Sequence, residues 1–215
     1  MSYVVTISGS PAAQSRSAHL LSVAELLLRA AGLTVRRINV RDLPATPLLH
    51  ADAAHPALRA AIELVENAQA VVIATPVYKV SYSGVLKTFL DLLPQTGLAG
   101  KVVLPIATGG SLAHLLALDY ALKPVLSALG ARHVASNVFG TDREVVWSEG
   151  SGYALNDDIG ERLKSSVEQL LQALTEQSEL REYRARFALE QVLSEARERH
   201  EAPRANLDVV LRHSA

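Results

Sequence analysis

The sequence predicts an α/β fold in which one parallel β-sheet is covered by helices on both faces. Short runs rich in β-branched residues alternate five times with longer runs of helical period, as expected of β/α units. The runs AVVIAT and VVLPIAT are apolar without alternation, which is typical of parallel strands buried on both faces. The chain has 215 residues, 49% of them hydrophobic, so one domain of this kind can bury a full core. We therefore expect a doubly wound sheet of five parallel strands in the order 2-1-3-4-5.

The expected elements follow one another as pairs of a strand and a helix. The strands are expected at residues 3–8, 33–40, 70–75, 101–108 and 132–139, and the helices that follow them at 17–31, 56–67, 83–93, 112–129 and 157–175. Pro105 lies inside the fourth of these strands. Because proline has no N–H to donate to a neighbouring strand, we expect a bulge or an edge position there.

A second proline, Pro124, lies inside the helix expected over residues 112–129. Its nitrogen cannot donate to the carbonyl of Tyr120, four residues back in the chain. We therefore expect a kink or a wide-turn bulge between Asp119 and Lys123, and such bulges are frequent at functional sites. The alternative is an ordinary proline-kinked core helix with a buried tyrosine.

Composition excludes several classes of function. The absence of cysteine excludes a disulfide framework, an iron–sulfur cluster and a thiol nucleophile, and the spacing of the seven histidines predicts no metal site. Basic residues number 21 and acidic residues 22, so the net charge is -1 and we expect no nucleic-acid partner. No stretch approaches the roughly 20 apolar residues of a spanning helix, and the start lacks a signal-peptide pattern. We expect no membrane partner and a cytoplasmic location.

The C-terminal segment differs in composition from the rest of the chain, which predicts a main domain over residues 1–177 and an extension over 178–215. The extension holds seven acidic and seven basic residues. Apolar residues recur among these charges at near-helical spacing, which favours an amphipathic continuation of the last helix. These residues are Leu180, Tyr183, Phe187, Leu189 and Val192. Docking across a subunit interface and a solvated tail both remain open.

Three loops at the carboxyl edge of the expected sheet carry the candidate chemistry, because ligands of open parallel sheets bind there. The first, residues 9–17, lacks the glycine patterns of dinucleotide-binding domains and of P-loop NTPases. It offers three hydroxyls, Arg16 and a helix N-terminus, which together suit a phosphate monoester. A cation at the start of a helix is unfavourable unless it has an anionic partner. Ser17 can also serve as the N-cap of that helix. The alternative is a plain turn before a capped helix.

The other two loops suit two kinds of ligand group, a flat ring at the first of them and an anion at the second. Residues 74–84 combine a proline, two tyrosines and a glycine, and they can present backbone groups and ring faces. The alternative is a capped loop with two half-buried tyrosines. Residues 107–111 form a short glycine turn whose N–H groups can make an anion-binding nest.

Together these segments resemble the NAD(P)H-dependent FMN reductases, which have a flavodoxin-like fold. The resemblance is carried by GSPAAQSRS, ATPVYKVSYSGVLKTFLDLLP and LPIATGGSLAHLLALDYALKPVLSALG, and it covers about residues 3 to 175. It is greatest to the flavin reductases of two-component alkanesulfonate monooxygenase systems. The segment beyond Ser178 is longer than is usual in this group.

The resemblance implies FMN as the flavin and NADPH or NADH as the reductant. It places Ser10, Ser15, Arg16 and Ser17 at the FMN phosphate, Pro76, Val77, Tyr78 and Lys79 along one edge of the isoalloxazine ring, and Thr108, Gly109, Gly110 and Ser111 at its pyrimidine side. Hydride passes between the two cofactors, so we expect no catalytic acid or base from the protein.

The resemblance also implies partners. Tyr120 matches an inserted tyrosine that forms a π-helix at the tetramer interface of the sulfonate-system reductases, where the flavin is a transferable substrate. We therefore expect a homo-oligomer, either a dimer or a tetramer, and a flavin-dependent monooxygenase that receives reduced FMN. A flavodoxin-like electron carrier and an FMN-retaining quinone or azo reductase are the alternatives, although a net charge of -1 is unusual for a carrier.

Overall fold

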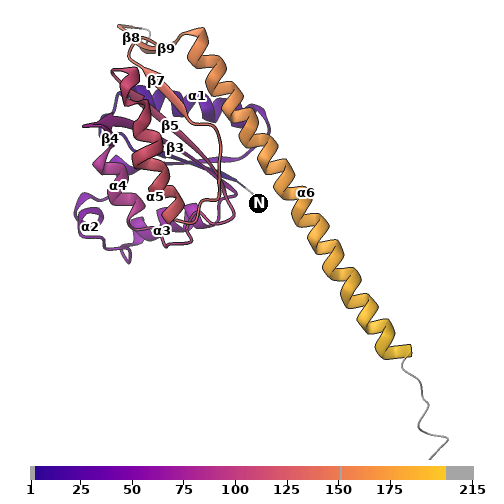
Figure 1. Cartoon of the computed structure of the whole chain (residues 1–215). Coiled ribbons are helices and arrows are strands. Elements are labelled where there is room, and N and C mark those ends of the chain that lie inside the picture. The colour runs from indigo at the N-terminus through magenta and orange to yellow at the C-terminus, as the bar shows by residue number, and fades with distance from the viewer. Residues whose placement is uncertain (1–2, 151, 202–215) are drawn as a thin grey trace, which may run out of the picture. The chain divides into compact units, whose positions relative to one another are not determined.

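The computed structural model describes residues 3–150 and 152–201 of the chain. The chain divides into two compact units, residues 1–174 and 175–215. The first unit contains the β-sheet (Figure 1). Among the described residues, no helix is both long and apolar enough to cross a membrane.

The sheet of the first unit has the predicted order. Its strands and those of two small hairpins are β1 Val4–Ser8, β2 Val35–Asn39, β3 Ala70–Tyr78, β4 Ser81–Tyr82, β5 Val102–Gly109, β6 His133–Val134, β7 Val138–Thr141, β8 Val145–Ser148 and β9 Gly152–Leu155. The parallel strands follow the order β2-β1-β3-β5-β6, and β7 also pairs with β5. Since β6 and β7 together take the fifth position, the order 2-1-3-4-5 is confirmed.

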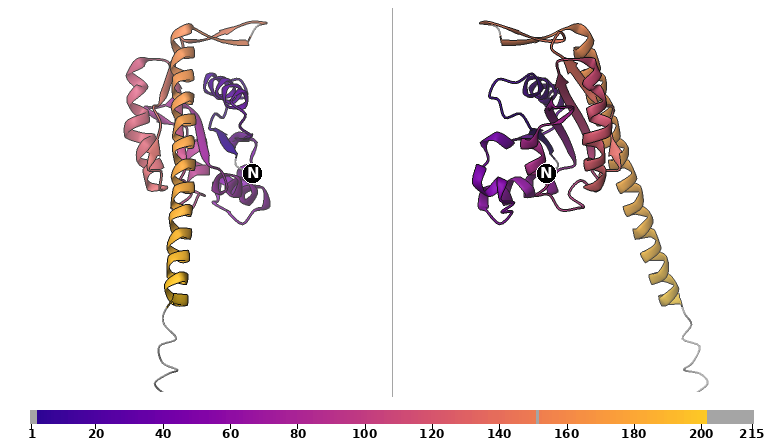
Figure 2. Two further views of the ribbon diagram at one scale, coloured as in Figure 1. Left: turned by 90° about the vertical axis from the view of Figure 1, so that its right-hand side faces the viewer. Right: turned by 60° about the vertical axis from the view of Figure 1, so that its left-hand side comes forward.

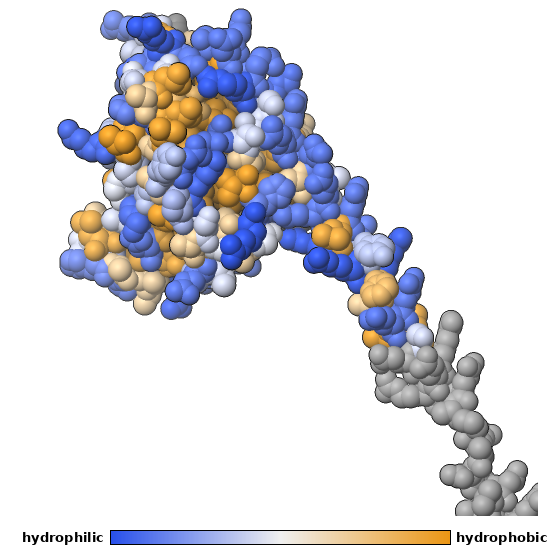
Figure 3. All heavy atoms as spheres, viewed as in Figure 1, coloured by the Kyte–Doolittle hydropathy of each residue, from blue (hydrophilic) through white to orange (hydrophobic). Residues whose placement is uncertain are grey.

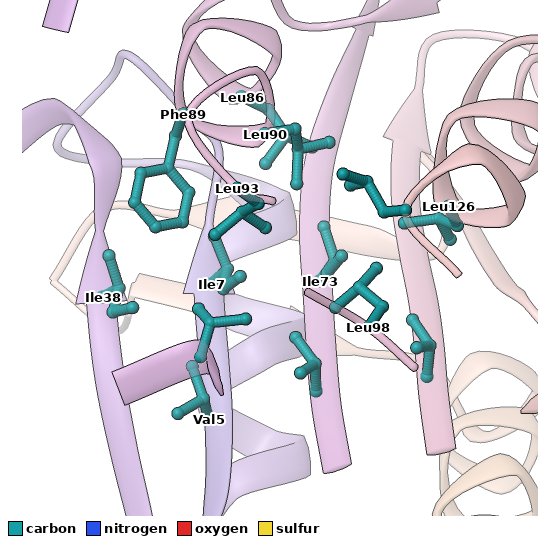
Figure 4. Packing of buried hydrophobic residues seen from close by; sticks show 14 of the residues in the cluster. Val5, Ile7, Ile38, Ile73, Leu86, Phe89, Leu90, Leu93, Leu98 and Leu126 are labelled. Carbon is teal, nitrogen blue, oxygen red and sulfur yellow. The ribbon is translucent and has the colours of Figure 1, made fainter. Parts of the chain in front are cut away.

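Helices cover both faces of this sheet, as predicted. The helical segments are α1 Arg16–Ala30, the 3₁₀ turn Val40–Asp42, α2 Ala45–Leu49, α3 Pro56–Glu66, α4 Gly84–Leu90, the segments leading into α5 Lys123–Ala128, and α6 Asp157–Glu201. On one face α3, α4 and α5 pack over Val5, Ile7 and Ile73 (Figure 4). On the other, α1 and the first part of α6 pack over Val4 and Val72. Successive side chains of a strand point to opposite faces, so two covered faces require strands without polar alternation.

Pro105 lies in a continuous strand, which corrects the expectation of a bulge or an edge. It pairs in regular register with Ile73 of β3. The N–H of Val102 points toward the β3 side of the strand, where it donates a hydrogen bond. The carbonyl of Val103 points toward the β6–β7 side, where it accepts from the N–H of Ala135. Because these directions alternate along a strand, the nitrogen of Pro105 faces the β6–β7 side.

The strand next to β5 is arranged so that the missing N–H donor of Pro105 is tolerated. We expected one strand over residues 132–139, but β6 pairs only with Val102–Val103 and β7 only with Ile106–Gly109. The break between β6 and β7 therefore lies opposite Leu104 and Pro105. A proline in a central strand is tolerated here because its partner strand is interrupted at that level.

The helix expected over residues 112–129 is broken into three pieces. A 3₁₀ turn spans Leu112–Leu115, a π-helical turn spans Leu118–Leu122, and α5 follows. Within the π turn the N–H of Lys123 donates to the carbonyl of Leu118, five residues back. Pro124 then lies in the first turn of α5, where its missing N–H costs little. Of the two expected forms of the break, the wide-turn bulge is confirmed. The separate 3₁₀ turn at the start of the segment was not predicted.

Two hairpins were not predicted. β3 continues to Tyr78 and turns back through Lys79 and Val80 into β4, where we expected a loop. Both turn residues have left-handed backbone angles, with φ of 51° and 64°. Such turns favour Asn-Gly, so Lys-Val gives no recognisable signal. The second hairpin, β8–β9, stands out from the body beside the start of α6 (Figure 2).

The second unit is helical where it is described. α6 runs on to Glu201, beyond the end expected at residue 175, so the predicted helical continuation is confirmed to that point. Its large apolar side chains are exposed, and these are Leu180, Tyr183, Phe187, Leu189, Val192 and Leu193. The end of the predicted extension, residues 202–215, lies outside the described residues.

Candidate flavin site

A cavity of about 270 Å³ opens at the carboxyl ends of β1, β3 and β5. It is lined by Ser10, Ala12, Gln14, Ser15, Arg16, Pro76, Val77, Tyr78, Thr108, Gly109, Gly110, Asp142 and Tyr153. All three loops singled out in the sequence therefore contribute to one site. Of the predicted residues, Ser17, Lys79 and Ser111 do not line it.

The first loop forms one end of the cavity and starts α1. The N-cap is Ser15, whose hydroxyl accepts from the N–H of Ala18 at 3.4 Å, so the assignment of Ser17 as N-cap was wrong. Ser17 is fully buried and its hydroxyl lies 2.9 Å from that of Ser15. It supports Ser15 from behind. The hydroxyl of Ser10 accepts from the N–H of Ala12 at 3.2 Å and so shapes the loop.

Arg16 is held at the rim of the cavity by the segment that follows β7. Its Nε donates to the carbonyl of Val145 at 2.9 Å, and one terminal nitrogen lies 3.4 Å from a carboxylate oxygen of Asp142. The guanidinium carbon is 5.9 Å from the centre of the Tyr153 ring. The side chain remains 35% exposed, so its outer nitrogens can reach an anion from solvent.

Buried hydrogen bonds tie the first loop to the loop after β3. Gly9 donates its N–H to Ala74 at 2.8 Å, and the carbonyl of Gly9 accepts from the hydroxyl of Ser83. Ser83 also caps α4 by accepting from Leu86, and its N–H donates to Thr75. These bonds hold the first loop, at one end of the cavity, beside the segment after β3.

The walls offer apolar surface and backbone. Pro76, Val77 and the half-exposed ring of Tyr78 form one side, whereas Lys79 is exposed in the hairpin turn. The Gly109–Gly110 turn forms the other, and Ser111 turns away to cap the 3₁₀ turn by accepting from Ala113.

Gly109 lies in a closely packed position. A Cβ built there would lie 3.0 Å from the Phe139 ring and 3.3 Å from Nδ1 of His114. That nitrogen is buried and makes no hydrogen bond to the described residues. One buried ring nitrogen next to the glycine turn is therefore still able to form a hydrogen bond.

Four lining residues were missed in the sequence: Ala12, Gln14, Asp142 and Tyr153. Asp142 and Tyr153 come from the β7–β8 connection and the β8–β9 hairpin, which had no recognisable signal. Tyr153 packs edge-on against Trp147 at 4.8 Å and tilts against His19 at 5.7 Å. Burial lowers the pKa of His19, so this imidazole is neutral near neutral pH and adds no positive charge beside the first loop.

Glu144 fixes the turn that presents Asp142. Burial acts to raise the pKa of its carboxyl group, but hydrogen bonds from the hydroxyl and N–H of Thr141, both at 2.7 Å, together with the charge of Arg162, outweigh this and lower it. Arg162 also donates to the carbonyl of Phe139 at 3.0 Å. The ionised form of Glu144 is thus the one that stabilises the turn.

We expect Glu144→Gln to lower the free energy of unfolding by about 1–2 kcal/mol near neutral pH, because bonds to a charged acceptor are lost. A depressed pKa stabilises the fold above the unfolded-state value of 4.5, and that contribution disappears as pH falls through the folded-state value. The variant should therefore lose less stability on acidification than the parent. Urea unfolding at neutral and acidic pH measures both. Exposed Glu161→Gln is the control, and equal pH dependence of variant and parent would contradict the assignment.

The residues of the cavity fit FMN. Hydroxyls, a guanidinium and the N-terminal amides of α1 lie at one end and suit a phosphate. The apolar side formed by Pro76, Val77 and Tyr78 suits a flat ring. At Gly110 an added Cβ would meet only Asp142, at 3.7 Å, so the backbone there is accessible to a ligand.

Comparisons with known proteins show the family of the chain. The family described as NADPH-dependent FMN reductase matches residues 2–145. A Pseudomonas putida protein described as FMN reductase (NADPH) is 50% identical over 166 residues, 77% of this chain and 84% of its own length. An Escherichia coli protein of the same description is 50% identical over 143 residues, 66% of this chain and 75% of its own.

A solved structure gives the same picture. The apo form of an NADH:FMN oxidoreductase, EMOB, superposes with a TM-score of 0.72 at 42% identity, covering 79% of this chain and 88% of that one. Fold, cavity and sequence lead to one conclusion: the chain belongs to the NADPH-dependent FMN reductase family and is an oxidoreductase that uses FMN together with NADPH or NADH.

Proposed function

We propose that the enzyme binds FMN in this cavity as a substrate, reduces it with NADPH or NADH, and releases it to a flavin-dependent monooxygenase. The FMN phosphate is assigned to Ser10, Ser15 and Arg16, with Ser17 as support. Pro76, Val77, Tyr78 and Lys79 are assigned to one edge of the ring, and Thr108, Gly109, Gly110 and Ser111 to its pyrimidine side.

In this proposal the protein contributes binding and electrostatics. Bound FMN supplies the ring that accepts a hydride from reduced nicotinamide. Arg16 and the first amides of α1 hold the phosphate and so fix the position of the ring. The N–H groups of the Gly109–Gly110 turn would stabilise negative charge at the pyrimidine side of the ring. No side chain needs to move a proton.

The π turn that carries Tyr120 is the observation that favours release of the flavin. In the reductases that this chain resembles, such a turn accompanies flavin as a transferable substrate. Tyr120 is 78% exposed, and Leu112 and Leu116 are exposed beside it. Apolar side chains gather over the segment that leads into α5 (Figure 3). We assign this surface to a contact between copies of the chain in a dimer or tetramer.

The flavin content of the purified enzyme tests the proposal. We expect a desalted preparation to be colourless and to oxidise NADPH or NADH only when FMN is added, because a transferable flavin dissociates. Absorbance near the flavin maximum and steady-state rates with both nicotinamides give the readout. A yellow protein that keeps its flavin through desalting would contradict release and favour an electron carrier or an FMN-retaining quinone or azo reductase.

A further inference from the structure

Asp142 brings a negative charge into the cavity beside the group assigned to the flavin phosphate. One carboxylate oxygen lies 3.4 Å from a terminal nitrogen of Arg16. The other would lie 3.7 Å from a Cβ built on Gly110. The carboxylate therefore lies between the arginine and the glycine turn, on the lining of the site.

The position of this carboxylate is built into the fold. The N–H of Glu144 donates to the carbonyl of Thr141 at 3.1 Å, which closes a four-residue turn with Asp142 at its second position. The Glu144 side chain binds back to Thr141 and pairs with Arg162. Because the turn is tied on both sides, Asp142 stays beside the site.

The same segment holds Arg16. Its Nε is committed to the carbonyl of Val145 at 2.9 Å, so the terminal nitrogens are the ones that can bind an anion. One of them faces Asp142. A phosphate that approaches Arg16 must share this guanidinium with the carboxylate or displace it, and the two anions repel each other.

We propose that Asp142 sets how weakly the enzyme retains FMN. It pairs with Arg16 before the flavin binds and repels the phosphate afterwards, which favours release of the nucleotide. This inference rests on the proposed role of Arg16 at the phosphate. The phosphate is the charged group of oxidised FMN, and riboflavin lacks it, so the repulsion distinguishes FMN from riboflavin.

The expected effect is moderate because both side chains are partly exposed, at 35% and 49%, and solvent screens their interaction. We expect Asp142→Asn to lower the dissociation constant for FMN by about 3- to 10-fold, where tenfold corresponds to about 1.4 kcal/mol. The constant for riboflavin should stay the same. Asp142→Glu keeps the charge and should not tighten FMN.

A double-mutant cycle on the full chain tests this. Dissociation constants for FMN and riboflavin are measured by flavin fluorescence quenching in the parent, Asp142→Asn, Arg16→Ala and the double variant. We expect Asp142→Asn to tighten FMN only where Arg16 is present. Asp91→Asn is the matched control, because it removes the carboxylate of another exposed ion pair, with Lys87, outside the cavity.

Each other outcome overturns the inference in a recognisable way. Unchanged or weaker FMN binding in Asp142→Asn shows that the carboxylate does not oppose the phosphate. Equal tightening of FMN and riboflavin, or equal tightening with and without Arg16, shows that no competition for the guanidinium takes place. If Arg16→Ala fails to discriminate between the two flavins, the assigned phosphate site itself is wrong. If it discriminates and Asp142→Asn has no effect, only the role of Asp142 is wrong.

Discussion

Arg16→Ala is expected to raise the KM for FMN by about 10- to 100-fold, because a hydrogen-bonded charge pair with phosphate contributes about 1.5–3 kcal/mol. Arg16 is the cation among the lining residues of the cavity, and its terminal nitrogens remain accessible. Riboflavin has no phosphate, so its KM should change little. The rate at saturating FMN should also change little, because the interaction is made equally in the ground state and in the transition state.

Two further variants sharpen this prediction. Arg16→Lys keeps the charge but loses the planar guanidinium and the Nε bond to Val145. Its KM for FMN should therefore lie between those of the parent and the alanine variant. Arg59→Ala removes a cation of α3 that lies outside the cavity and should leave the KM for both flavins unchanged. Steady-state kinetics with both flavins give the values. An equal rise in KM for FMN and riboflavin in Arg16→Ala would show that Arg16 positions the loop and does not bind phosphate.

The layered fold could be predicted because its signals are local and repeated. Apolar runs without alternation, as in AVVIAT, indicate strands covered on both faces, and the clusters on both sides of β3 show why. Pro124 predicted a kink or a wide-turn bulge, because its missing N–H leaves the carbonyl of Tyr120 without its helical donor, and the π turn is such a bulge. Most residues that line the cavity could be predicted as well, because loops at the carboxyl ends of parallel strands must lie at one edge of the sheet.

The features that were predicted wrongly or missed depend on residues that are far away in the sequence. The sequence marks Pro105 as unsuited to a central strand, but only the register of β6 and β7 shows that the strand opposite it is interrupted. Asp142 enters the site through the β7–β8 connection, which is held by Glu144 and Arg162. The pairing of Arg162 with Glu144, 18 residues earlier, leaves no periodic signal in the sequence.

Gly9→Ala is expected to cause the largest loss of stability, about 3 kcal/mol, because it forces extra volume into a packed interior. A Cβ at this position would lie 2.6 Å from Cβ of Leu86 and 3.2 Å from both of its methyl groups. Leu86 is fully buried in α4, and its Cβ cannot move without its backbone. Gly9 cannot move away either, since its N–H is bonded to Ala74 and its carbonyl to Ser83.

The same clash should weaken FMN binding, because Gly9 precedes the loop that carries Ser10. Forcing α4 and this loop apart strains the bonds by which Ser83 holds the first loop beside the start of α4. Gly84→Ala is the matched control: a Cβ there meets nothing within 4 Å, and alanine favours a helix over glycine. Urea unfolding and FMN titration of both variants compare the effects. If Gly9→Ala were as stable as the parent and bound FMN equally, the contact between the first loop and α4 would not hold the site together.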